Sequence, residues 1–206
     1  MIKQRHTLKI IILLFLFNSN SAIVSAAEHI LIPKFGVVER NDNTNHHVGN
    51  NSFDLDDDIV SAPGFTYLYK LDNGIAFGAE FFGYENEIIS TANNDGDATT
   101  GHIYGIVEKL FNAEGTVKPF IGMGLGMVSI NFDANINGEI SDDYEDNAVG
   151  LSYEIFAGAE FEINKDIGMT VEYKYFNFEV DDDIDDRDIE VESDGHALFV
   201  GVAIHI

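Results

Sequence analysis

The 206-residue chain contains no cysteine, no tryptophan and only 3 prolines, and it has 11 lysines and arginines against 36 aspartates and glutamates. The absence of cysteine excludes a disulfide framework and any thiolate nucleophile or metal ligand. The shortage of cations, with a formal net charge of -25, argues against nucleic-acid binding because phosphate contacts need a basic surface. No apolar stretch reaches the roughly 20 residues of a spanning helix. At 45% hydrophobic and 12% aromatic residues, the chain is nevertheless too apolar for a solvating acidic tail.

The N-terminus has the order of a secretory signal peptide. Lys3, Arg5 and Lys9 precede the apolar run 10–17, and small residues follow over 21–27. We therefore expect a cleaved signal over 1–26 and a single domain over 27–206. Loss of the three cations changes the formal charge from -25 to -28. A mature chain without a spanning helix enters a membrane only as a β-barrel, and a soluble exported domain is the alternative.

The mature chain reads as a series of strands separated by turns of two lengths. Segments rich in Ile, Val, Phe, Tyr and Gly alternate with stretches rich in Asn, Asp and Gly, which is typical of strands and loops. The predicted strands are 30–39, 59–71, 75–85, 101–111, 117–132, 149–163, 167–179 and 195–206. Short turns at 72–74, 112–116 and 164–166 alternate with long loops at 40–58, 86–100, 133–148 and 180–194. In an antiparallel meander this alternation places every long loop at one end.

Period-two patterning gives each strand one apolar face. The strand 149–163 is the clearest case, with Val149, Leu151, Tyr153, Ile155, Ala157, Ala159 and Phe161 on one face. The other face mixes glycine, serine and a few carboxylates, which suits a narrow, packed and ion-paired interior. The pattern predicts an all-β fold, an eight-stranded antiparallel up-and-down transmembrane β-barrel with the apolar face towards lipid. A soluble ligand-binding barrel would have the two faces inverted.

Two segments resemble a known family. The stretch Lys118-Pro119-Phe120-Ile121-Gly122-Met123-Gly124-Leu125-Gly126 is similar to a Pro-aromatic-x-Gly-x-Gly-x-Gly strand of the small outer-membrane β-barrel superfamily, which includes the OmpA transmembrane domain, OmpX and opacity-type porin-family proteins. The end Gly201-x-x-Ile204-x-Ile206 resembles the signal read by the barrel assembly machinery, although family members usually end in an aromatic residue. The resemblance implies a monomer in the Gram-negative outer membrane, in contact with lipopolysaccharide.

Charged residues within the strands are the candidates for a lumen site. A dry lumen forces such side chains to pair. They form either an ion-conducting pore or, the interpretation we favour, a structural salt-bridge network in a barrel just wide enough for side chains. The candidates are Glu80, Glu108, Glu154, Glu160, Glu172 and Lys174, together with Lys70 and Lys109, whose facing the pattern leaves open.

The long loops hold most of the negative charge. Their formal charges in chain order are -4, -3, -6 and -7, with the last counted over 180–193, so that they carry -20 of the mature -28. Such a rim attracts cations and repels anions within a Debye length of about 8–10 Å. In the third loop the residues alternate like the ligands of an EF-hand calcium loop, but Tyr144 replaces the final glutamate, so a solvated turn is the alternative. The candidate calcium ligands are Asp133, Asn135, Asn137 and Glu139, and no other cofactor is expected.

Catalytic motifs are missing from the sequence. Some barrels of this superfamily are lipid A deacylases or acyltransferases, but no His-x-Ser-Asn pattern accompanies the histidines, and the pair His46-His47 reads as an exposed loop. We expect no catalysis and a structural or surface-interaction role, with an extracellular or host partner that the sequence does not name. A small-solute porin is the alternative function.

Overall fold

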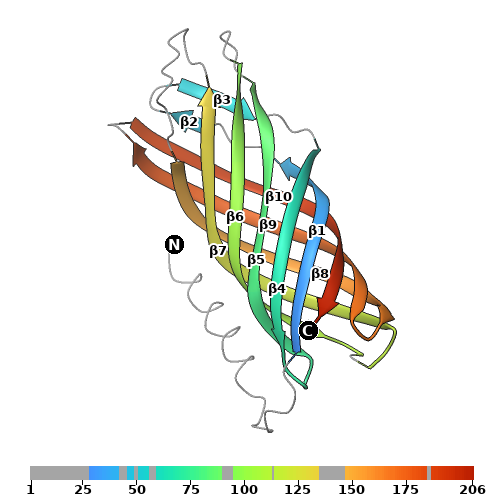
Figure 1. The fold of residues 1–206 in the computed structure, drawn as a ribbon. Coiled ribbons are helices and arrows are strands. Elements are labelled where there is room, and N and C mark those ends of the chain that lie inside the picture. The colour runs from blue at the N-terminus through green and yellow to red at the C-terminus, as the bar shows by residue number, and fades with distance from the viewer. Residues whose placement is uncertain are drawn as a thin grey trace.

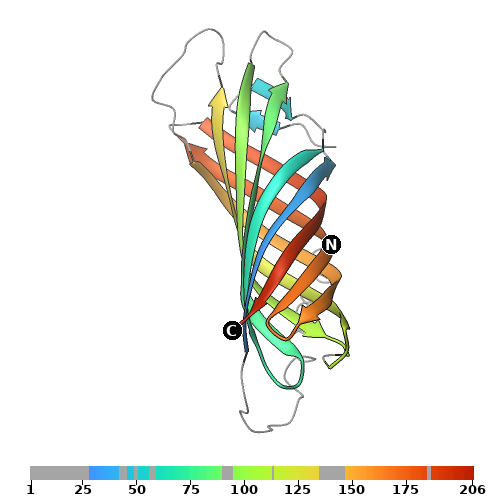
Figure 2. The same cartoon turned by 45° about the vertical axis from the view of Figure 1, so that its right-hand side comes forward.

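The chain folds as a closed antiparallel β-barrel. The computed structural model describes residues 28–41, 46–48, 51–55, 59–89, 95–112, 114–134, 147–184 and 187–206. Its strands are β1 (Glu28–Asn41), β2 (His46–Val48), β3 (Asn51–Leu55), β4 (Val60–Lys70), β5 (Ile75–Ile89), β6 (Asp95–Leu110), β7 (Val117–Ala134), β8 (Asn147–Asn164), β9 (Ile167–Ile184) and β10 (Arg187–His205). The eight long strands pair with their chain neighbours, and β1 pairs with β10 to close the barrel (Figures 1 and 2). This confirms the predicted eight-stranded up-and-down fold. Among these residues no helix is long and apolar enough to cross a membrane.

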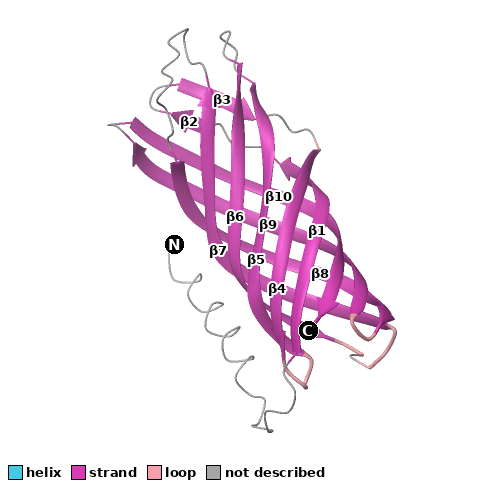
Figure 3. Cartoon of the chain, in the orientation of Figure 1, coloured by secondary structure: helices cyan, strands magenta, loops and turns pink. Residues whose placement is uncertain are grey.

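Three tight connections lie at one end of the barrel, which we call the turn end (Figure 3). Gly74 adopts a positive φ of 75°, and its amide donates to the carbonyl of Leu71 at 2.9 Å. Asn112 also has a positive φ, of 53°, and its carbonyl accepts from the amide of Gly115 at 2.9 Å. Glycine and asparagine tolerate this left-handed backbone better than other residues, which explains why these turns were readable in the sequence.

The opposite end, the loop end, differs from the prediction in its first connection. The stretch 40–58 was expected to be one loop, but it contains the hairpin β2–β3. Val48 pairs with Ile189 of β10, and Leu55 pairs with Ile88 of β5. Both β10 and β5 extend past the paired parts of β1 and β4 at this end. Their free backbone edges need partners, and the hairpin supplies them.

The strands next to the other long loops also extend further than predicted. The segment expected to be a loop over 180–194 is largely paired backbone, because β9 continues to Ile184 and β10 begins at Arg187. The predicted ends at Glu179 and Gly195 were placed where apolar alternation stops. Outside a membrane both faces of a hairpin can be polar, so the loss of alternation does not end the pairing. Much of the acidic sequence is therefore carried on strand extensions.

The outward face of the barrel is apolar. Leu125 and Leu151 are 75% and 76% exposed, and alternate residues on all eight long strands continue this band. Histidine and tyrosine side chains also lie on this face: His29 meets Tyr67 towards the turn end, with 2.8 Å between Nδ1 and the hydroxyl, and Tyr173 meets His196 further up, at 2.7 Å. An apolar band around the outside is the exterior of a transmembrane barrel, and it is the inverse of a soluble one.

The interior is filled by side chains. Its core combines aliphatic residues with many aromatic ones, among them Phe82, Tyr104, Phe156, Phe176 and Phe199, all less than 5% exposed. An eight-stranded barrel has an interior that side chains can fill completely. The predicted mixture of small and charged residues is present, but large rings occupy much of the space between them.

Candidate functional site

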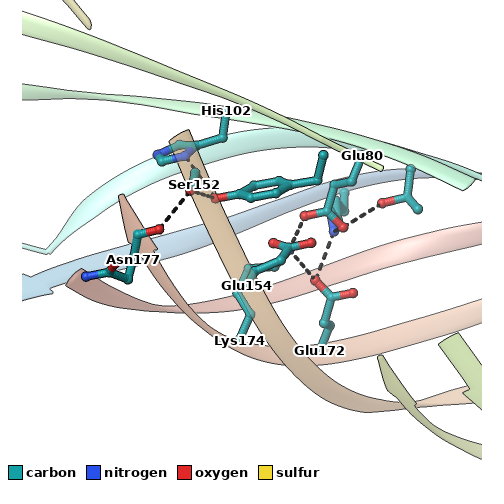
Figure 4. A network of polar contacts seen from close by, with 10 residues as sticks. Glu80, His102, Ser152, Glu154, Glu172, Lys174 and Asn177 are labelled. Carbon is teal, nitrogen blue, oxygen red and sulfur yellow. Dashed lines mark hydrogen bonds and ion pairs between the residues drawn. The ribbon is translucent and has the colours of Figure 1, made fainter. Parts of the chain in front are cut away.

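The centre of the lumen holds a buried lysine surrounded by carboxylates. The Lys174 side chain, on β9, has no solvent exposure. Its Nζ donates to Glu80 of β5 and, at 2.9 Å, to Glu154 of β8, and it lies 3.3 Å from Glu172 (Figure 4). Three strands therefore direct their charges to one point. A cation removed from water needs such close oxygen partners, because desolvation otherwise costs several kcal/mol.

A second lysine completes this central cluster. Lys34 of β1 donates to Glu80 at 2.7 Å and to Glu172 at 2.9 Å, so those two carboxylates are shared by both lysines. Thr66 donates to the same Glu80 oxygen at 3.2 Å. The central cluster thus joins two lysines and three glutamates from β1, β5, β8 and β9. It ties opposite walls of the barrel together across the lumen.

Aromatic rings cover the cluster on its loop side. Lys174 Nζ lies 5.0 Å from the ring centre of Phe82 and Lys34 Nζ lies 4.8 Å from that of Phe199, both in the range of cation–π attraction. Phe82 in turn stacks on the fully buried His102, with 4.6 Å between ring centres. The His102 Nδ1 is 3.1 Å from the hydroxyl of Tyr104, which lies 2.5 Å from Ser152 Oγ. Most of this layer is aromatic ring surface. Its polar atoms on His102, Tyr104 and Ser152 lie within hydrogen-bond distance of one another.

A second group of charges lies in the lumen at the turn end. Lys118 of β7 contacts Glu160 at 3.1 Å and Glu162 at 2.8 Å. His205, near the end of β10, lies 2.5 Å from Glu28 of β1 and 3.0 Å from Glu160. The first and last strands of the barrel are thereby joined through side chains as well as through backbone pairing.

Between the central cluster and the turn end lies a small cavity of about 20 Å³. Glu108, only 7% exposed, lines this cavity together with Thr66, Thr170 and Glu172. Within the part of the chain that the structure describes, Glu108 has no hydrogen-bond or ion-pair partner. A polar cavity of this size has room for about one water molecule.

The lumen candidates from the sequence lie in three places along the barrel. Glu80, Glu154, Glu172 and Lys174 meet in the central cluster, Glu160 belongs to the turn-end group, and Glu108 lines the cavity. Of the two lysines whose facing was left open, Lys70 bonds Glu28 at the turn end, whereas Lys109 lies on the outward face. Of the six charged residues that the sequence assigned to the lumen, five form ion pairs, and Glu108 is the exception.

The sequence analysis did not identify several residues of the lumen site. Lys34 and Lys118 neutralise carboxylates in the lumen, and the layer around His102 was not expected. Lys34 lies two positions from Ile32 in the strand 30–39, so the two side chains share one face of the strand. A lysine on an otherwise apolar face could have been recognised as a lumen charge from the sequence. Of the predicted calcium ligands, Asp133 falls within strand β7, while Asn135, Asn137 and Glu139 lie outside the described residues.

Comparison with known proteins agrees with the barrel. Residues 25–201 match the model of the outer membrane protein beta-barrel domain, and the chain belongs to this family. A search among curated proteins finds no match.

Solved structures share the fold at low sequence identity. OprG of Pseudomonas aeruginosa is 12% identical with a TM-score of 0.58, over 88% of this chain and 96% of its own. Neisserial surface protein A is 12% identical with a TM-score of 0.57, over 87% and 99%. Ail, the attachment invasion locus protein of Yersinia pestis, is 14% identical with a TM-score of 0.52, over 88% and 100%. Membership of the family places the protein in the outer membrane.

Proposed function

We propose that this protein is a non-catalytic outer-membrane barrel that holds its lumen closed and presents acidic loops to the cell surroundings. The observation that carries the proposal is Lys174, a fully buried cation held by three carboxylates in the middle of the lumen. Rings cover it on one side and a second ionic group lies on the other. Such packing stabilises a plug, and a water-filled passage would need it to open.

The proposed orientation puts the turn end in the periplasm and the loop end outside the cell. Residues 1–26 act as the signal peptide, the barrel assembly machinery inserts the mature chain as a monomer, and lipopolysaccharide surrounds the outer half of the apolar band. The support is the order of charges and apolar residues before Ala27 and the terminal pattern Gly201-x-x-Ile204-x-Ile206. Mass spectrometry of the mature protein is expected to find a chain that begins at Ala27, and an intact Met1 in the membrane fraction contradicts the signal assignment.

The surface role follows from charge. One of the similar structures, Ail, was solved with a heparin analogue, a sulfated and therefore anionic ligand. The loop segments of the present chain carry a formal charge of -20 and repel such a ligand. We therefore propose that its extracellular or host partners are cationic, or that divalent cations bridge them to the loops.

Loop neutralisation tests the surface role. Asp142, Asp143, Glu145 and Asp146 are replaced by Asn or Gln in cells that display the protein, and binding of fluorescent polylysine is measured by flow cytometry. We expect weaker binding than for the wild type, and a smaller dependence on salt. The change Glu114→Gln, in a turn at the opposite end, is the control and leaves binding unchanged. Equal binding of the loop variant and the wild type, with both barrels folded, contradicts the proposal.

Calcium binding by the third loop is a separate proposal. Asp133, Asn135, Asn137 and Glu139 alternate as oxygen ligands around Gly138. Terbium luminescence of the folded protein, competed by calcium, tests it. The double change Asp133→Asn and Glu139→Gln is expected to abolish the saturable signal. A signal that is unchanged in this variant contradicts the assignment of these ligands.

A small-solute channel is the second candidate, and one observation favours it. Glu108 borders a cavity and has no ion-pair partner among the described residues, so the plug is not ion-paired throughout. A lumen that rearranges its ion pairs could connect this cavity to either end. Single-channel recording separates this candidate from the closed barrel.

A further inference from the structure

The outward wall has a groove as well as a convex surface. A concave region of about 520 Å³ crosses five neighbouring strands, from β5 to β9. Two adjacent rows of directly paired residues line its outward side. Ile75, Lys109, Ile121, Ala157 and Tyr173 form the first row, and Val107, Met123, Ile155 and Tyr175 form the second. Four strand spacings of about 4.8 Å give the first row a length of about 19 Å. This exceeds the roughly 15 Å half-thickness of a hydrocarbon core, as expected for a groove that runs obliquely.

The floor of the groove is a small side chain between large ones. Ala157 stands on β8 between Ile121 on β7 and Tyr173 on β9, both more than half exposed. A flexible apolar chain that lies above this methyl group would make dispersion contacts with the larger side chains on both sides. The groove therefore has the shape and polarity for a single hydrocarbon chain.

One end of the groove carries a positive charge. Lys109 lies next to the β4–β5 turn, where its Nζ donates to the carbonyl of Asn73. In the described strands, Lys34, Lys70, Lys118 and Lys174 all have carboxylate partners, whereas Lys109 has none. In a chain with a net charge of -25, a lysine without a carboxylate partner at the membrane boundary has donors left for an external anion.

We propose that this groove is a phospholipid site: one acyl chain lies along Ile121, Ala157 and Tyr173, and the phosphate binds Lys109. The proposal relies on the orientation given under the proposed function, because the turn end must face the leaflet that contains phospholipid. The site is defined by both parts, since the apolar row selects a chain and the lysine at its end selects an anionic headgroup.

Native mass spectrometry of the full mature protein, folded in detergent and supplied with a palmitoyl-oleoyl phosphatidylglycerol, tests the site. The wild type is expected to retain one lipid. Ala157→Phe fills the floor and is expected to reduce retention at least fivefold. The matched control is Ala159→Phe, two residues along the same outward face but outside the groove, which keeps the wild-type retention. Ile121→Trp is a second filling variant in case Ala157→Phe does not fold.

The headgroup assignment has its own comparison. Lys109→Gln is expected to lower retention of the lipid at least threefold, whereas Lys165→Gln, in the neighbouring β8–β9 turn, leaves it unchanged. Mobility on unboiled gels shows in each case that the barrel has folded, so a failure of lipid binding is distinguishable from a failure of the barrel itself. Equal retention by Ala157→Phe and Ala159→Phe overturns the site. A wild-type dimer mass that Ala157→Phe abolishes also overturns the site, because a second copy of the chain then covers the groove.

Discussion

At the scale of single residues, the lumen is organised by a few buried charges. The carboxylates were readable from the sequence because Glu80, Glu154 and Glu172 interrupt otherwise apolar or small-residue faces. Of their two lysine partners, Lys34 was harder to assign, because it lies on β1 and is distant in sequence from Glu80 and Glu172. Long-range pairing depends on barrel closure and register, which alternation within one strand does not contain.

Among the lumen residues, we expect replacement of Lys174 to lower the free energy of unfolding most. Lys174→Met keeps a side chain of similar length but leaves Glu80 and Glu172 with Lys34 alone and Glu154 without a cation. Breaking a buried ion pair by removing one partner costs about 3–5 kcal/mol, and we expect the free energy of unfolding to fall by that amount. Urea unfolding in detergent micelles measures this change. It can be followed by tyrosine fluorescence, because the chain has no tryptophan. A loss below about 1 kcal/mol would show that the carboxylates do not depend on this lysine.

Glu108 should behave in the opposite way. It is buried beside a cavity and has no side-chain partner among the described residues. Replacing a buried polar group that lacks a partner by an apolar one of similar size removes a desolvation cost of about 1–3 kcal/mol. Glu108→Leu is therefore expected to raise the free energy of unfolding, while Glu80→Leu, which removes a partner of two lysines, lowers it. Equal destabilisation by both changes would contradict this expectation and would show that Glu108 makes a stabilising contact.

At the scale of strands and turns, the sequence predicted the elements that local patterns define. It missed the elements whose backbone partners come from distant parts of the chain. The eight long strands and the turns at Gly74 and Asn112 follow from alternation and from turn chemistry. The hairpin β2–β3 does not, because its partners β10 and β5 are supplied by distant parts of the chain. The strand extensions at the loop end were missed for the same reason.

Two glycines on paired strands allow a test of how closely the wall is packed. A Cβ atom added at Gly126 on β7 would lie 1.8 Å from the Ile103 carbonyl oxygen, whereas one added at Gly105 on β6 would come no closer than 3.8 Å to its neighbours. We expect Gly126→Ala to destabilise the barrel by about 1–3 kcal/mol, the usual cost of overpacking, and Gly105→Ala to change it little. Urea midpoints of the two variants are compared with the wild type. Equal midpoints contradict the close approach of β6 and β7.

At the scale of the whole molecule, the barrel separates three chemical zones. Its outside is an apolar band, its lumen is ion-paired and aromatic, and its loop segments are acidic. The outer-membrane fold followed from the first zone together with the strand count. The closed state follows from the second, which only the assembled structure shows, because seven of the eight long strands contribute ion-paired side chains to it.

The most direct test of the closed lumen is single-channel recording of the wild-type barrel in a planar lipid bilayer. Protein that shifts in mobility between boiled and unboiled samples is inserted, and a general diffusion porin serves as the positive control. We expect a baseline without unitary openings for the wild type, because Lys174, Lys34 and their carboxylates span the lumen. Stable, cation-selective openings of the folded wild-type protein would contradict it and would favour the channel.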